Sequence, residues 1–451
     1  MKIIIIGLGI MGETVLGSLR GEGHTVTVVD EDEQVVEMLI EKYDVMGVVG
    51  NGACMDIQRE AGVLGADLVV ALTQSDEVNI LCCMVAKCLG VQNTVARVRN
   101  PDYRRQIVAM KEQLGISMVV NPERETANEI FNLINLPQVA QIDHFAAGKV
   151  LLVEVVAEAG CTLIGESLLS LGKKLANKVL ICAVQRGAEV IIPGGNFTFA
   201  EKDHVYFTSD ARTLGDFLSE VNLVKSPLRN VMIAGEGRAA YYLAERLSGR
   251  KYNVKIVAKS LARAEELAEA LPRATVVHGN SARHELLIEE GIEAADAFVA
   301  LTAGDEENML LSMFAKRKSV KKSITRIESD DLYDMLDEVG IENKVSPKNI
   351  VASRILSYIR ALANKRGSNV LTLYRLVNNR VEALEFAAKK KEYFYDTPLR
   401  ELHMKDNSLI ACIIRDGEVI IPNGNDTICL GDNVIVVTTH KNFDDLNDLF
   451  E

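Results

Sequence analysis

The sequence contains no tryptophan, and aromatic residues make up only 5% of it. Long apolar runs are also missing, since none approaches the roughly 18 to 20 residues that a membrane-spanning helix needs. The eight cysteines are scattered, without a C-x-x-C pair or a spacing typical of zinc ligands. These absences argue against a transmembrane segment, a disulfide framework and a metal centre. We expect the cysteines to be small buried side chains in a reducing compartment.

A basic surface is lacking as well. The chain has 63 acidic and 50 basic residues, for a formal net charge of −13. Proteins that bind nucleic acid need clustered lysine and arginine to displace the counterions of the phosphates, and direct adsorption to anionic lipid has the same requirement. We therefore expect no nucleic-acid partner and no direct membrane insertion, so that any role at a membrane would run through a protein partner.

Motifs of catalysis are absent too. The sequence has no G-x-S-x-G, H-E-x-x-H or G-x-x-x-x-G-K-[ST] pattern. None of its seven histidines stands in a motif with a carboxylate partner. We therefore expect no catalytic residues, and the chain is predicted not to be an enzyme.

The sequence does contain one pattern written twice. The opening "IIIIGLGIMG" is matched by "VMIAGEGRAA" around Gly235, and "ADLVVALTQSDEVN" is matched by "ADAFVALTAGDEEN". Further along, "AVQRGAEVIIPGGN" is matched by "CIIRDGEVIIPNGN". Repeats on this scale decide the architecture of a protein. The chain is predicted to be two tandem copies of a two-part unit, joined near Pro227.

The first part of each copy has the pattern of a parallel α/β domain. In copy one, short apolar runs predict strands and the stretches between them predict helices. The strands are expected at 2–6, 25–29, 45–49, 67–72 and 94–98, and the helices at 11–21, 33–43, 55–63 and 77–89. This alternation predicts a parallel sheet covered on both faces. The fold class is α/β, with two Rossmann-like doubly wound domains, each followed by a small α+β module.

The repeat also sets the expected domain boundaries. A helix follows each Rossmann-like domain, and two destinations remain open for it: its own domain or a partner subunit. In the small modules, helical stretches are expected near "GESLLSLG" and "TPLRELH", and Asp416-Gly417 predicts a hairpin. The predicted Rossmann-like domains are 1–122 and 229–347, the helices are 123–136 and 348–366, and the small modules are 137–221 and 367–451.

The first glycine loop has the context that dinucleotide binding requires. Gly7, Gly9 and Gly12 follow an apolar strand and open a helix, and Asp30 ends the next strand. The glycines permit a tight turn, a close approach to pyrophosphate and close helix packing, while the N–H groups of the helix start hold the phosphates. A carboxylate at Asp30 can accept both ribose hydroxyls and would repel a 2′-phosphate, which favours NAD(H) or an adenine nucleotide over NADP(H). The loop residues Leu8, Ile10 and Met11 complete the predicted site.

Three further candidates lie at the carboxyl ends of later strands. Asn51 follows the third strand, Thr73 the fourth, and Arg97 ends the fifth, where ligands of doubly wound sheets bind. Thr73, with Ser75 and Asp76, could equally cap the following helix. Arg97 could reach phosphate or form a surface ion pair.

The second glycine loop lacks the ribose acceptor, because Ala258 stands where copy one has Asp30. Glu236 lies between its glycines, where a carboxylate would repel phosphate, and Arg238 could offset that charge. Three interpretations stay open: an empty structural domain, a site for ATP or ADP, and an NADP-type site that uses Lys259. The candidate residues of this second site are Gly235, Gly237 and Arg238.

The whole chain resembles the tandem RCK (KTN) family, which includes regulatory subunits of bacterial and archaeal Trk potassium-uptake systems. The resemblance rests on "IIIIGLGIMG" with Asp30, "GNGAC", "ALTQSDEVNIL", "ARVRNPDY", "VNPERETANEI", "VIIPGGN" and "VIIPNGN". It implies a cytoplasmic homo-oligomeric ring, peripheral to the inner face of the membrane, that gates an integral potassium transporter in response to NAD(H) or ATP/ADP. It also implies that the helices after Pro122 and Pro347 are crossover helices between paired domains.

Two other functions remain as alternatives. An NAD-dependent oxidoreductase with an unrecognised catalytic residue is the first, since a nicotinamide site alone does not distinguish a sensor from a dehydrogenase. A transcriptional regulator is the second, and the acidic charge and the absence of a helix-turn-helix pattern disfavour it.

Overall fold

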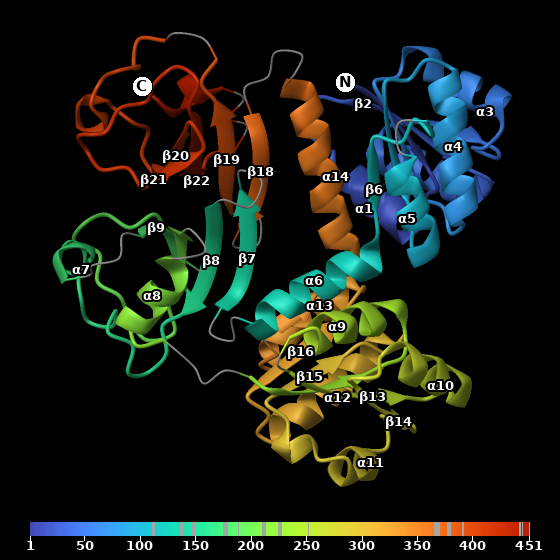
Figure 1. The fold of residues 1–451 in the computed structure, drawn as a ribbon. Helices are drawn as coiled ribbons and strands as arrows, with labels where there is room; N and C mark the ends of the chain where they lie inside the picture. Colours follow the sequence, from blue (N-terminus) through green and yellow to red (C-terminus); the bar gives the residue numbers. More distant parts are fainter. Residues whose placement is uncertain are drawn as a thin grey trace. The chain divides into compact units, whose positions relative to one another are not determined.

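The computed structural model divides into two compact units (Figure 1). Met1–Ile134 and Leu228–Ile359 form the first unit, which holds both Rossmann domains, and Asn135–Pro227 and Arg360–Glu451 form the second, which holds both small modules. Each repeat therefore contributes to both units. The structure describes residues 1–110, 113–135, 139–145, 150–174, 179–187, 189–209, 213–223, 228–250, 252–341, 343–364, 370–376, 380–389, 392–441, 443 and 445–450.

The first Rossmann domain is a six-stranded parallel sheet in the order β3-β2-β1-β4-β5-β6. Its central strands are buried on both faces, which explains their continuous runs of isoleucine and valine. The strands are β1 (Lys2–Ile6), β2 (Thr25–Asp30), β3 (Met46–Val49), β4 (Leu68–Ala71), β5 (Asn93–Arg97) and β6 (Met118–Val120). The helices are α1 (Ile10–Ser18), α2 (Glu33–Tyr43), α3 (Met55–Glu60), η1 (Val63–Gly65), α4 (Asp76–Cys88) and α5 (Pro101–Ala109).

The second Rossmann domain repeats this topology in the order β14-β13-β12-β15-β16-β17. Its strands are β12 (Asn230–Ala234), β13 (Asn253–Ala258), β14 (Thr275–His278), β15 (Ala297–Ala300), β16 (Lys322–Arg326) and β17 (Asn343–Val345). Its helices are α9 (Arg238–Ser248), α10 (Leu261–Ala270), α11 (His284–Glu289), η3 (Ile292–Ala294), α12 (Asp305–Arg317) and α13 (Asp330–Glu338). The predicted α/β fold is confirmed in both copies. The sequence patterns missed α5 and the sixth strand, which is only three residues long in each sheet.

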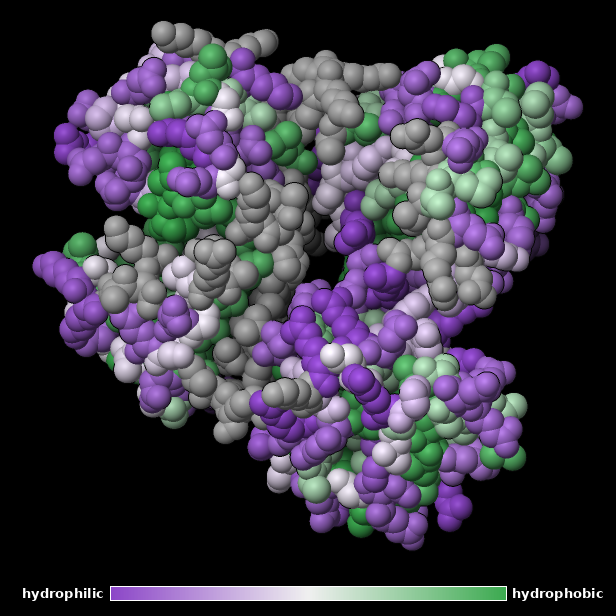
Figure 2. Space-filling view, in the orientation of Figure 1, coloured by the Kyte–Doolittle hydropathy of each residue, from purple (hydrophilic) through white to green (hydrophobic). Residues whose placement is uncertain are grey.

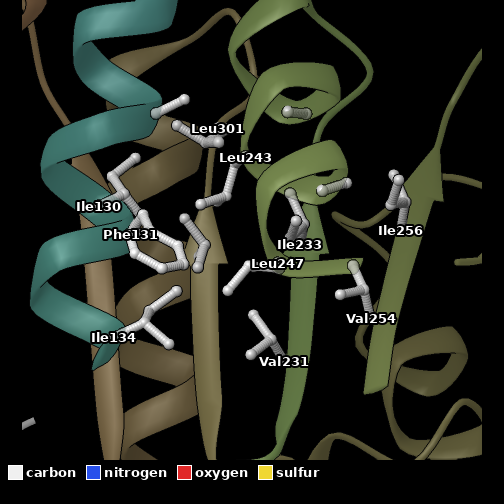
Figure 3. Close-up of a cluster of buried hydrophobic side chains, with 14 of the residues drawn as sticks. Ile130, Phe131, Ile134, Val231, Ile233, Leu243, Leu247, Val254, Ile256 and Leu301 are labelled. Atoms are coloured by element: carbon white, nitrogen blue, oxygen red, sulfur yellow. The ribbon is translucent and has the colours of Figure 1, made fainter. Parts of the chain in front are cut away.

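The helix after the first Rossmann domain, α6 (Pro122–Asn135), packs into the core of the second one. Ile130, Phe131 and Ile134 of α6 lie among side chains of β12, β13 and α9, as Figure 3 shows. The residue pattern left two destinations open, its own domain and another subunit, while the family resemblance implies a crossover between paired domains. In the structure the helix crosses to the other repeat of the same chain.

The helix after the second Rossmann domain, α14 (Pro347–Asn364), contacts the first repeat in turn. Arg354 forms an ion pair with Glu125 of α6 at 3.1 Å. The Tyr358 hydroxyl lies 3.5 Å from the amide oxygen of Asn93 at the start of β5. The two Rossmann domains are thus paired through reciprocal contacts of these helices.

The small modules are five-stranded antiparallel sheets in the orders β10-β9-β11-β8-β7 and β18-β19-β22-β20-β21. The first contains β7 (Val139–Phe145), β8 (Val150–Val156), α7 (Leu168–Lys174), β9 (Leu180–Arg186), β10 (Glu189–Ile191), β11 (His204–Ser209) and α8 (Thr213–Glu220). The second contains β18 (Val370–Leu376), β19 (Val381–Ala387), η4 (Leu399–Glu401), β20 (Ser408–Arg415), β21 (Glu418–Ile420), β22 (Asn433–Thr438) and η5 (Leu446–Leu449).

Two local predictions in these modules can be compared with the structure. The Asp416-Gly417 hairpin is confirmed, because β20 and β21 pair on either side of it and both residues have positive φ angles of 50° and 84°. The helix expected at "TPLRELH" is only the short 3-10 turn η4. The proline that precedes this turn lacks an N–H donor, and the following Leu402 is already extended.

The two small modules share a buried apolar cluster, to which both repeats contribute. Leu152 and Cys182 of the first module pack with Ala383 and Cys412 of the second. Burial raises the pKa of Cys182 and of Cys412 to about 12, which keeps both thiols protonated and unreactive at neutral pH. The cysteines of this cluster therefore behave as small core residues.

Phe131→Ala should destabilise the paired Rossmann domains by about 3 kcal/mol, because it opens a cavity in a core that two repeats share. Phe131 also lies under the guanidinium groups of Arg246 and Arg250, whose centres are 4.3 and 4.8 Å from its ring. Urea denaturation followed by circular dichroism would measure the loss. Asn132→Ala, on the same helix and outside the cluster, is the control; equal midpoints for the two variants would contradict the assignment.

Candidate functional site

The first glycine loop makes a sharp turn that only glycine can follow. Gly7 has a φ of +90°, and a side chain there would overlap the backbone of Leu72 and Thr73. Gly12 lies against the carbonyl oxygen of Gly7, which leaves no space for a Cβ atom. Gly9 is different, because nothing lies within 4 Å of where its Cβ would be. The loop is therefore closely packed at Gly7 and Gly12 and has open space at Gly9.

The open side exposes the start of helix α1. Gly9 is the N-cap residue of α1, and no side chain caps the helix there. The first N–H groups of an α-helix have no partner within the helix, and they carry the positive end of its dipole. This helix start can therefore accept an anion such as a pyrophosphate.

Asp30 is held directly beside the loop. Its Oδ2 accepts the N–H of Leu8 at 2.6 Å, and its Oδ1 accepts the N–H of Asp32 at 3.1 Å. Asp30 is only partly buried and lines the cavity at this loop, and a carboxylate has more acceptor sites than these two bonds use. Asp30 can thus shape the loop and still accept hydroxyl groups from a ligand.

These elements surround a cavity of about 700 Å³, which is within the range of small-molecule and cofactor sites. All the predicted first-site residues line it except Gly12, which is buried behind the loop and acts through packing. The lining residues among them are Gly7, Leu8, Gly9, Ile10, Met11, Asp30, Asn51, Thr73 and Arg97.

Two of the lining side chains are already committed to other partners. The amide oxygen of Asn51 accepts the N–H of Ala53 at 2.8 Å. The Thr73 hydroxyl donates to the amide oxygen of Asn79 at 2.8 Å, while the hydroxyl of Ser75 caps helix α4. Thr73 and Asn51 therefore shape the wall of the cavity more than they offer free polar groups.

Arg97 lines the same wall and has a donor group without a hydrogen-bond partner among the described residues. Its Nε is buried and has no hydrogen-bond partner among the described residues. Burial, and next the charge of Arg99, lower the pKa of the Arg97 guanidinium. A buried cation of this kind is stabilised by a nearby anion, so the cavity fits a phosphate-bearing ligand.

The sequence patterns missed five charged residues of the cavity. Two of them, Glu31 and Asp32, directly follow Asp30 in the chain. Arg99 is held there by Asp76, whose carboxylate accepts the Arg99 N–H at 2.9 Å and lies 3.3 Å from its Nε. The last two come from the second repeat: Glu328 follows β16 of the Rossmann domain, and Lys348 lies in the first turn of α14. They could not be found from the local motif, although Glu328 occupies the position in its own repeat that Arg99 has in the first.

The second glycine loop differs in shape from the first. Gly235 has a φ of +139°, and Ala240, which replaces Gly12, is fully buried. Gly237 is the N-cap of α9 without a side-chain cap, and Arg238 begins that helix and is exposed. The predicted second-site residues are thus together at a helix start, but Glu236 bridges the loop to the N–H of Ser260 at 2.7 Å.

No described group of three or more His, Cys, Asp or Glu side chains is arranged to hold a metal ion. Among the described helices, none is long and apolar enough to cross a bilayer.

A glycine loop at a helix start, an acid at the end of the second strand and two doubly wound sheets define the class of protein: a tandem Rossmann-type nucleotide-binding protein. The Rossmann domains match the TrkA-N domain at residues 3–122 and 231–347, and the small modules match the TrkA-C domain at residues 152–222 and 384–451. The chain belongs to the TrkA family.

Curated relatives match the chain over nearly its full length. The Trk system potassium uptake protein TrkA of Vibrio alginolyticus is 32% identical over 100% of this chain and 99% of its own length. A TrkA homolog of Methanosarcina mazei is 31% identical over 97% of both chains. Among solved structures, the GsuK RCK domain covers 97% of this chain and 92% of its own, with a TM-score of 0.63 at 17% identity. The GsuK channel bound to NAD has a TM-score of 0.64 at 17% identity and covers 97% of this chain and 76% of its own.

Proposed function

We propose that the chain is the cytoplasmic regulatory subunit of a Trk-type potassium uptake system. It binds NAD(H) or an adenine nucleotide at the first glycine loop and gates an integral membrane transporter without catalysing a reaction. The observation that carries this proposal is the cavity at the first loop, whose lining comes from both Rossmann domains. The membership of the TrkA family, whose curated members are named as potassium uptake proteins, supports the transport role.

The residues of the first cavity fit an adenine nucleotide in three places. Asp30 would accept the ribose hydroxyls, as an acid at the end of the second strand does in NAD-binding Rossmann folds. The N–H groups after Gly9 would hold the first phosphates. Arg97, whose Nε has no partner among the described residues, would meet further phosphate charge.

Such a ligand would act on two domains at once. Glu328 of the second Rossmann domain and Lys348 of α14 share the cavity with the first glycine loop, and the Nζ of Lys348 forms an ion pair with Asp330 at 2.8 Å. A ligand shifts a conformational equilibrium only by the difference in its affinity for the two states. The charged groups of the ligand would interact with charged side chains of both repeats. A change in the relative position of the two repeats would therefore change the affinity for the ligand.

We further propose that the chain assembles with copies of itself through the outer helices of the Rossmann domains. Leu81 and Met84 of α4 are 47% and 38% exposed, and apolar side chains are visible among polar ones over this region in Figure 2. Leu310 and Met313 occupy the matching positions of α12 and are 59% and 39% exposed. Two apolar pairs at equivalent places of a repeat suit an assembly that uses each repeat in the same way, such as a ring.

Asp30→Ala should weaken NADH binding at least tenfold, because it removes charge-assisted hydrogen bonds to the ribose, which are worth about 1.5 to 3 kcal/mol. Isothermal titration calorimetry of the purified chain would measure this. Glu37→Ala, which removes an exposed acid from α2, is the matched control and should leave the affinity unchanged. An affinity within twofold of the wild type for Asp30→Ala would refute the ribose contact.

The double change Leu81→Glu with Met84→Glu should reduce the oligomer to a smaller species, since two exposed apolar side chains of the proposed contact face would be replaced by carboxylates that repel one another. Light scattering coupled to size exclusion gives the mass. Cys88→Ser, an exposed change on the same helix, is the control. An unchanged mass for the double variant would exclude this face of α4 from the assembly.

The transport role predicts that the tagged chain isolated from detergent-solubilised membranes brings an integral potassium transporter with it. Mass spectrometry of the isolated complex identifies the partner, and an untagged chain is the control. Recovery without any integral membrane protein would count against the proposed partner. Consumption of NADH by the purified chain with hydroxy or oxo acids would instead favour the oxidoreductase alternative.

A further inference from the structure

The second glycine loop is bridged by one of its own side chains. The Glu236 carboxylate extends from the loop and accepts the N–H of Ser260 through its Oε2 at 2.7 Å. Ser260 is the N-cap of α10, directly after the end of β13. On the other side, the backbone oxygen of Glu236 accepts the Nε–H of Arg263 at 3.2 Å. The loop is thereby tied to the next strand and helix without any ligand.

The first repeat has the same bridge in the opposite direction. There the acid belongs to the strand, and Asp30 accepts the N–H of Leu8 in the loop. In the second repeat the acid belongs to the loop, and Ala258 takes the place of Asp30 at the strand end. The substitutions Leu8 to Glu236 and Asp30 to Ala258 therefore form a reciprocal exchange, in which the carboxylate that links loop and strand end moves from the strand to the loop.

The exchange has opposite consequences for a nucleotide. An acid on the strand stands at the ribose end and leaves the helix start open to phosphate. An acid on the loop, such as Glu236, extends its side chain across the space between the helix start and the strand. The ribose and the first phosphate of a nucleotide would occupy this space, so the carboxylate adds negative charge where they would bind. Gly237 itself leaves room at this approach, since among the described residues no atom except those of its chain neighbours lies within 4 Å of a Cβ built on it.

The arginine of the second crevice is also neutralised. Arg326 occupies the position that Arg97 has in the first repeat, and its guanidinium pairs with Glu328, the same residue that lines the first cavity. In contrast, the Arg97 Nε is buried without a partner among the described residues. The second repeat thus uses its own carboxylates at both places where a nucleotide would otherwise bind. Glu236 links the loop to Ser260, and Glu328 pairs with Arg326.

We propose that Glu236 closes the second glycine loop as a built-in substitute for a nucleotide, so that the chain binds a single nucleotide, at the first loop. The proposal rests on the proposed nucleotide binding by the first repeat and deepens it. The Glu236 side chain holds the second Rossmann domain in one conformation. Nucleotide binding then changes only the first domain, which moves relative to the second. Among the three interpretations of the second loop, this selects the structural one and names the residue that enforces it.

A transplant of the first-repeat arrangement tests the proposal. In the Asp30→Ala background, where the first site is disabled, Glu236→Leu with Ala258→Asp gives the second repeat the residue types of the first. Calorimetry with NADH should show binding in this triple variant within tenfold of the wild-type affinity. Glu236→Leu alone lacks the ribose acceptor, and Ala258→Asp alone places two carboxylates in one crevice, so each single change in that background should leave binding at least tenfold weaker.

Amide hydrogen exchange provides a readout in the unaltered protein. With saturating NADH, the peptide around Asp32 should exchange more slowly, whereas the peptide around Ser260 should be unchanged. In Glu236→Leu without ligand, the Ser260 peptide should exchange faster than in the wild type, because its N–H loses the acceptor.

Each outcome distinguishes the two proposals. A wild-type stoichiometry of two nucleotides per chain, or NADH protection at Ser260, would overturn the closure by Glu236. No NADH binding by the wild type would refute the nucleotide site of the first repeat, while the exchange rate of Ser260 in Glu236→Leu would still decide whether the bridge exists. If the triple variant does not fold, as judged by circular dichroism, the wild-type stoichiometry and the exchange pattern decide.

Discussion

The burial of the apolar face of α6 in the second Rossmann domain is the interaction on which the remaining structure depends. Ile130, Phe131 and Ile134 would expose a continuous apolar stripe if the first Rossmann domain stood alone. Burying a large apolar side chain contributes about 1.5 to 3 kcal/mol, so the pairing of the two domains is strongly favoured. That pairing brings Glu328 and Lys348 to the first glycine loop. A single-repeat fragment would lose one wall of the candidate site.

Pairing within one chain also permits the two repeats to differ. In an assembly of identical domains, every substitution appears on both sides of the interface. Here the position of Arg99 in the first repeat is held by Glu328 in the second, and the helix that begins with Pro122 and Glu123 in the first repeat begins with Pro347 and Lys348 in the second. The cavity therefore combines charges that a symmetric pair could not place together.

The local features of the fold could be predicted from the residue patterns, whereas the contacts between the two repeats could not. The loop from Gly7, the acid at Asp30 and the alternation of strands and helices follow from neighbouring residues, because backbone sterics and side-chain periodicity act over one βαβ unit. The destination of α6 depends on which apolar surface is complementary to it, and the amphipathic pattern alone does not contain that information. Repulsion of phosphate by Glu236 stays a prediction from the sequence, and its hydrogen bond to the N–H of Ser260 depends on the distance between a loop and a helix start that are 24 residues apart in the chain.

The charges around the first loop explain how one cavity could distinguish nucleotides that share an adenosine. In the proposed function, Asp30 and the start of α1 would contact the shared adenosine and first phosphates, so they would contribute affinity without separating one ligand from another. Arg97, Lys348 and Glu328 line the same cavity. In the proposed function, a triphosphate would bring additional negative charge toward these groups, whereas the second half of NAD would bring a ribose and a nicotinamide ring. Because two of these three residues belong to the second repeat, that difference in ligand charge would become a difference in how strongly the two repeats are drawn together, which is the quantity a gating subunit must vary.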